Sequence, residues 1–102
     1  MYNPKDTIVA CATGPNGVIG IVRASGENVF EICKKIFIPS MPFENPHPNN
    51  AYFLKIVDES KNIIDRAVVL IYIAPRSFTG ENMVEIFAHN SPFIIKKIIE
   101  LF

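Results

Sequence analysis

The sequence has no long hydrophobic run, no excess of charge and few cysteines. The longest uninterrupted apolar run, Ala67–Ala74, has eight residues, whereas a helix that spans a membrane needs about 20. Ten basic side chains balance ten acidic ones, so the chain has no overall field that would attract nucleic acid or an anionic membrane. The two cysteines, Cys11 and Cys33, suit a reducing compartment, and we expect both to be small buried side chains.

Several sequence motifs are also missing. Lys5 and Asp6 precede a first apolar segment of only five residues, Ile8–Ala12, which is not the pattern of a signal peptide. Together with the cysteine usage, this predicts a cytoplasmic protein without a membrane segment. No Gly-Lys dipeptide occurs, which excludes a Walker phosphate loop in this chain. His47 and His89 lack the spacing of a metal-ligand set, and no pattern indicates a nucleophilic triad. We predict neither a catalytic residue nor a metal site.

Hydrophobic periodicity predicts a single α+β domain over residues 1–102, with a mixed or antiparallel sheet of about five strands and two helices. The order of the elements is β-β-α-β-β-β-α. The run Val68–Ile73 is apolar at successive positions, which predicts a central strand covered on both faces. The predicted strands are 7–13, 18–25, 51–57, 63–74 and 82–89, and a turn at Gly14–Gly17 joins the first two.

The first helix has recognisable ends. Ser25 is its expected N-cap, its apolar positions recur at helical spacing from Val29 to Phe37, and Pro39 ends it. The four prolines of residues 39–50 predict a long extended loop after it.

The second helix begins with Ser91 as N-cap and Pro92 as first helical residue. The chain stops on two apolar residues, Leu101 and Phe102, in the middle of this predicted helix. We therefore expect the chain to be a fragment of a longer protein. The residues expected to face inward are Ile94, Ile95, Ile98, Ile99 and Phe102.

The stretch Ser77–Pro92 carries most of the functional information. Gly80, in the predicted turn Phe78–Glu81, can adopt the positive φ that other residues resist. In the strand that follows, Glu85 is a carboxylate among apolar residues, and burying it alone would be very costly. Period-two alternation places Met83, Glu85, Phe87 and His89 on one face and Val84, Ile86 and Ala88 on the other.

Arg23 is a second ionic side chain inside a predicted strand. Arg23 and Glu85 could form a salt bridge with each other. They could instead bind a flat heteroaromatic ligand, because a carboxylate accepts two parallel hydrogen bonds from a ring edge with N–H and NH2 groups, as in a pterin or guanine, and arginine complements carbonyl or carboxylate oxygens. They could also face a partner chain. The residues alone leave these interpretations open.

Three segments of the chain together resemble the N-terminal domain of the MnmE (also called TrmE or ThdF) tRNA-modification GTPases. The motifs occur in the order typical of that family and extend over nearly the whole chain. They are Asp6–Ala10 with Ala12-Thr13, then Gly-Ile-Val-Arg-Ala-Ser-Gly at 20–26, then Ala-Pro-Arg-Ser-Phe-Thr-Gly-Glu at 74–81 followed by Val84-Glu85-Ile86 and His89.

The resemblance implies a fold akin to the tetrahydrofolate-binding domains of aminomethyltransferases. It also implies a homodimer that binds 5-formyl-tetrahydrofolate or a related reduced folate, and the family's folate contacts in this region fall on Arg23 and Glu85. For the full-length protein it implies a GTP hydrolase, with GTP, magnesium and potassium bound in a G domain absent from this chain. With the flavoprotein MnmG, such proteins install an aminomethyl-type group on the wobble uridine of tRNA. This chain alone is expected not to be catalytic.

Two alternatives to this function stay open. The chain could be a purely structural homodimerisation module in which Arg23 and Glu85 bridge subunits, or an aminomethyltransferase-like enzyme that shares the fold.

One local difference from the family concerns the backbone conformation. Where the family usually has His-Gly-Gly-Pro, this chain has His-Asn-Ser-Pro at 89–92, so Asn90 is expected to adopt the left-handed conformation.

Overall fold

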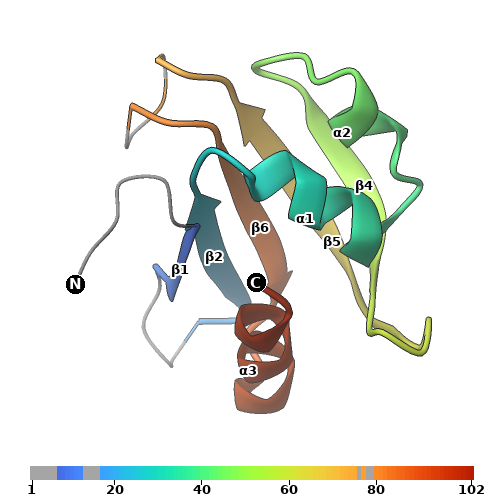
Figure 1. Ribbon diagram of the computed structural model, residues 1–102. Helices are drawn as coiled ribbons and strands as arrows, with labels where there is room; N and C mark the ends of the chain where they lie inside the picture. The colour runs from blue at the N-terminus through green and yellow to red at the C-terminus, as the bar shows by residue number, and fades with distance from the viewer. Residues whose placement is uncertain (1–6, 13–16, 76, 78–79) are drawn as a thin grey trace.

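The computed structural model describes residues 7–12, 17–75, 77 and 80–102. Within these residues the chain forms one antiparallel sheet of six strands, in the order β1-β2-β6-β5-β4-β3, with three helices (Figure 1). The predicted α+β class is confirmed, and one short strand and one short helix add to the expected five strands and two helices. The elements are β1 Ile8–Cys11, β2 Ile19–Ser25, α1 Val29–Ile36, β3 Phe37–Ile38, α2 Met41–Glu44, β4 Ala51–Val57, β5 Ile63–Tyr72, β6 Met83–His89 and α3 Pro92–Leu101.

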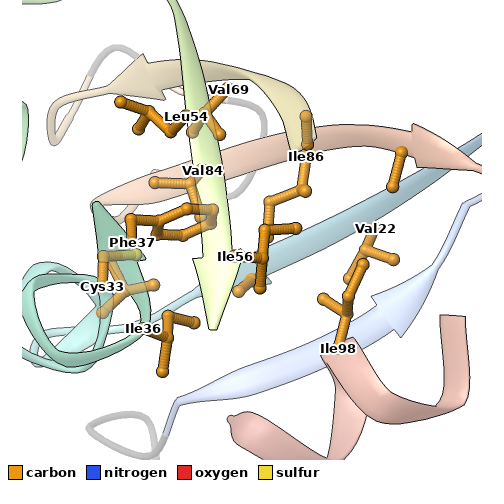
Figure 2. Close-up of a cluster of buried hydrophobic side chains, with 14 of the residues drawn as sticks. Val22, Cys33, Ile36, Phe37, Leu54, Ile56, Val69, Val84, Ile86 and Ile98 are labelled. Carbon is orange, nitrogen blue, oxygen red and sulfur yellow. The ribbon is translucent and has the colours of Figure 1, made fainter. Parts of the chain in front are cut away.

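The three helices contribute to one hydrophobic core on one face of the sheet. Cys33 and Ile36 of α1 belong to the same buried cluster as Val84 of β6, and Ile98 of α3 lies near Val22 of β2 (Figure 2). Each of these five side chains is at most 6% exposed. Because side chains alternate along a strand, this packing assigns the other set of alternate residues to the opposite face.

We call that opposite face the open face. Several of its apolar side chains are accessible to solvent: Phe53 is 69% exposed, Ile19 57% and Val68 39%. The prediction that the strand containing Val68 is covered on both faces is therefore wrong. β5 does lie inside the sheet, between β6 and β4, but only its alternate residues Ala67, Val69 and Ile71 are fully buried.

The first helix begins later than predicted. Its N-cap is Asn28, not Ser25. Ser25 is the last residue of β2, where it lies opposite Met83 of β6, and the next backbone N–H, from Gly26, donates to the carbonyl of Asn82 at 3.0 Å. Pairing with β6 thus continues through the position at which the local sequence favours a cap.

After the first helix the structure differs from the prediction because two aromatic residues are buried against each other. Phe37 was expected in the helix, but with Ile38 it pairs with β4 as strand β3. The segment 39–50 was expected to be an extended loop, but it contains α2, which includes Phe43. The rings of Phe37 and Phe43 stack with centroids 5.2 Å apart, and each residue is 1% exposed. Burial of this non-local pair outweighs the local helical pattern and the proline content.

The C-terminal part of the chain follows the prediction closely. β6 has the expected alternation, and α3 begins at Pro92 after Ser91, whose side chain accepts a hydrogen bond from the backbone N–H of Ile94. Gly80 has the expected positive φ, 79°. Arg76 and the predicted turn residues 14–16 and 78–79 lie outside the described residues.

Two local expectations are wrong. Cys33 is buried, but Cys11, on the short strand β1, is exposed. Asn90 does not have the left-handed conformation, which Asn49 and Lys61 adopt instead. The side chain of Asn90 donates to the carbonyl of Gly17 at 2.8 Å, so hydrogen bonding rather than backbone strain shapes this turn.

No helix in the described part of the chain is long and apolar enough to cross a membrane.

The packing of α3 predicts that Ile98→Ala lowers the free energy of unfolding by about 2–5 kcal/mol, because the isoleucine is fully buried and alanine would leave a cavity. Phe93→Ala is the matched control, since Phe93 lies on the same helix but is 68% exposed; it should change stability by less than about 1 kcal/mol. Urea denaturation followed by circular dichroism measures both. Equal losses would contradict the placement of α3.

Candidate functional site

The two ionic strand residues singled out in the sequence lie directly opposite each other. In the register of β2 and β6, Arg23 pairs with Glu85, and the Arg23 Nε donates to Glu85 Oε2 at 2.7 Å. The Glu85 side chain is 11% exposed and that of Arg23 is 41% exposed. Both lie on the open face, so the structure confirms that they form an ion pair and also places that pair where the helices do not cover it.

A third residue, Tyr72 of β5, completes the site. Its hydroxyl donates to the other carboxylate oxygen, Glu85 Oε1, at 2.5 Å. β2 and β5 flank β6 in the sheet, so the carboxylate is held from both neighbouring strands. We call these three residues the Arg23–Glu85–Tyr72 cluster.

The sequence interpretation missed Tyr72. A signal was present, since alternation along β5 places Tyr72 on the same face as Leu70. The face that carries Leu70 and Tyr72 is also the face that carries Glu85, because Leu70 pairs with Glu85. Because this register connects strands that are distant in sequence, the strand patterns alone did not supply it.

The cluster keeps Glu85 ionised. Burial raises the pKa of Glu85, but hydrogen bonds from Tyr72 and Arg23, with the positive charge of Arg23, outweigh burial and leave the pKa below its ordinary value. The hydrogen bond to Glu85 raises the pKa of Tyr72, and burial and the carboxylate charge act in the same direction. At neutral pH the cluster therefore consists of a carboxylate, a guanidinium and a neutral phenol.

The acceptor capacity of the Glu85 carboxylate favours a ligand that donates hydrogen bonds. An ionised carboxylate has about four lone-pair positions. Arg23 and Tyr72 each donate a hydrogen bond to one oxygen of Glu85. The carboxylate can therefore accept further N–H groups. Leu70, opposite Glu85 on β5, and Phe87, two residues along β6, provide apolar surface on the same face.

The histidines have other environments. His89 Nδ1 lies 2.9 Å from Asp65 Oδ1, and the backbone N–H of His89 donates to Asp65 Oδ2 at 2.9 Å. His47 Nε2 lies 3.4 Å from Asn45 Nδ2. Among the residues that the structure describes, no three His, Cys, Asp or Glu side chains are grouped so that they could hold a metal ion.

Comparison with known proteins identifies the family. The family described as "GTP-binding protein TrmE N-terminus" matches residues 7–102. The chain belongs to this TrmE N-terminal family. The resemblance found in the sequence motifs is thus confirmed.

Several relatives of the chain share the name tRNA modification GTPase MnmE. The protein of Francisella tularensis subsp. holarctica is 44% identical over 101 residues, covering 98% of this chain and 21% of the relative. That of Aquifex aeolicus is 41% identical over 96% of this chain and 21% of the relative. That of Thermus thermophilus is 37% identical over 97% and 23%, respectively. The TrmE N-terminal chain therefore spans about a fifth of the length of these relatives.

The hydrogen bond from Tyr72 predicts a pH effect. Because the pKa of Glu85 is lowered in the folded protein, its ionisation stabilises the fold above the unfolded-state pKa, and this contribution is lost as the pH falls through the lowered value. Tyr72→Phe removes one donor, so the pKa of Glu85 should rise towards its unfolded-state value and the stabilisation that its ionisation contributes above that value should become smaller. Titration of the 13C-labelled glutamate carboxyl groups by NMR measures the pKa.

Tyr52→Phe is the matched control for this substitution. Tyr52 lies on β4, and its hydroxyl accepts a hydrogen bond from Asn50 at 3.4 Å. Its removal should leave the Glu85 titration unchanged. An unchanged titration in Tyr72→Phe as well would show that the Tyr72 hydrogen bond does not stabilise the carboxylate.

Proposed function

We propose that this chain is the folate-binding and dimerising N-terminal domain of a tRNA-modification GTPase, and that its ligand is 5-formyl-tetrahydrofolate or a related reduced folate. Membership of the TrmE N-terminal family supports the general assignment. The observation that carries the ligand assignment is the position of the Arg23–Glu85–Tyr72 cluster on the open face.

Each residue of the cluster has a specific role in this proposal. The Glu85 carboxylate accepts hydrogen bonds from the N–H and NH2 groups on the edge of the pterin ring. Arg23 places its positive charge near carbonyl or carboxylate oxygens of the ligand. Tyr72 donates a hydrogen bond to Glu85 and thereby fixes the orientation of its carboxylate. The bound folate supplies a one-carbon group, and the residues of this chain bind and orient it.

The wider activity belongs to the complete protein. Several relatives are named tRNA modification GTPase MnmE, and we propose that the complete protein hydrolyses GTP in a separate G domain that binds magnesium and potassium. In the cytoplasm, with the flavoprotein MnmG, it would support an aminomethyl-type modification of the wobble uridine of tRNA. This chain would contribute the folate site and no catalytic residue.

A second candidate function is a structural homodimerisation module without a folate site. The exposed apolar residues of the open face, such as Phe53 and Ile19, favour contact with a second copy of the chain, because burial of apolar surface drives association. In this alternative Arg23 and Glu85 stabilise the dimer and bind no ligand. An aminomethyltransferase-like enzyme is less well supported, since the relatives described above are named as GTPases.

Glu85→Gln should weaken the binding of 5-formyl-tetrahydrofolate by about 2 kcal/mol, or roughly thirtyfold in Kd, because a charged acceptor of the pterin N–H groups is replaced by a neutral amide. Isothermal titration calorimetry on the complete protein measures the affinity. Glu31→Gln, an exposed glutamate on α1, is the matched control and should bind like the unmodified protein.

The same samples distinguish the two candidate functions. Light scattering gives the oligomeric state, and circular dichroism confirms that the variants are folded. A dimer that binds no reduced folate would support the structural module. Folate binding that does not change in Glu85→Gln would refute the assigned role of the carboxylate.

A further inference from the structure

The open face continues from Glu85 into an apolar hollow. Phe87 follows Glu85 on the same face of β6 and lies opposite Val68 of β5. Val68 in turn lies opposite Phe53 of β4. These three side chains line a hollow of about 200 Å³ together with Ile19 and four other residues. The remaining lining residues are Val18, Arg66, Ala88 and His89.

Two basic residues are associated with this hollow. Arg66 lines it, and Lys55 of β4 lies directly opposite Arg66 on the same face. Like charges directly opposite each other on neighbouring strands are destabilising, so an anion bound between them would be favoured. Asp65 precedes Arg66 on β5, and its carboxylate contacts the ring and backbone N–H of His89.

The spacing fits one extended ligand. Leu70 lies opposite Glu85, and Arg66 lies four residues from Leu70 along β5. At about 3.3 Å per residue, this separation is roughly 13 Å. A pterin whose ring edge is held at Glu85 could therefore place an attached aromatic ring over Phe87 and a terminal carboxylate near Arg66.

We infer that the apolar hollow and the Lys55–Arg66 pair form the subsite for the tail of a reduced folate. The aminobenzoyl ring packs against Phe87 and Val68, and the glutamate carboxylates bind Arg66 and Lys55. This inference rests on the proposed function and adds a preference to it: ligands with several glutamates bind more tightly than ligands with one, and ligands without a tail bind least tightly.

The test compares three ligands by calorimetry on the complete protein: 6-methyl-tetrahydropterin, which has no tail, and 5-formyl-tetrahydrofolate with one or three glutamates. Arg66→Gln should weaken the two tailed ligands by roughly tenfold, the expected effect of one charge-assisted hydrogen bond. It should leave the tailless ligand within about twofold. Added salt should reduce the difference between the tailed ligands.

Two further variants separate this inference from the proposed function. Glu85→Gln should weaken all three ligands, because it acts on the ring. Lys35→Gln removes an exposed charge from α1 and should change none of them. If Arg66→Gln weakens tailed and tailless ligands equally, or alters dimerisation and not binding, the tail subsite is refuted while the folate site stands. If Glu85→Gln alters no ligand, the proposed function is refuted.

Discussion

The carboxylate of Glu85 constrains the structure around it. An ionised group as buried as Glu85, which is 8% exposed, is costly unless it is paired and hydrogen-bonded. Here β2 supplies Arg23 and β5 supplies Tyr72, and these strands are the two neighbours of β6. A shift of β6 by one residue would turn Glu85 into the hydrophobic core. The hydrogen bonds that hold the carboxylate therefore help to specify the register of three strands.

The two faces of the sheet have separate tasks. On one face, Val22, Val84 and Ile86 pack with side chains of the helices, and each is fully buried. On the other face, the intervening residues are free to be ionic, aromatic or exposed without disturbing that core. Strand alternation allows a hydrophobic core and a surface of different chemistry to be built from the same few strands. Changes to the exposed side chains of the open face can thus be made at small cost to the hydrophobic core.

Much of this arrangement could be predicted from sequence, and the exceptions share a physical cause. The alternation of β6 and the start of α3 are local patterns, and they were predicted correctly. Glu85 and Arg23 were conspicuous because charge is rare in apolar strands, and the family resemblance marked the same two residues. Ser25, Phe37 and Tyr72 were misassigned or missed because their positions depend on pairing or stacking with distant segments. Local propensity is weaker than such non-local contacts.

The strands at the two borders of the sheet are short: β1 has four residues and β3 has two. Each border strand therefore presents only a short stretch of regular backbone for a strand from another molecule to join, and short edge strands are a common way in which sheet proteins avoid uncontrolled polymerisation. Association between copies would then depend on side-chain complementarity, which can be specific and self-limiting. The short border strands thus disfavour open-ended growth by strand-to-strand pairing.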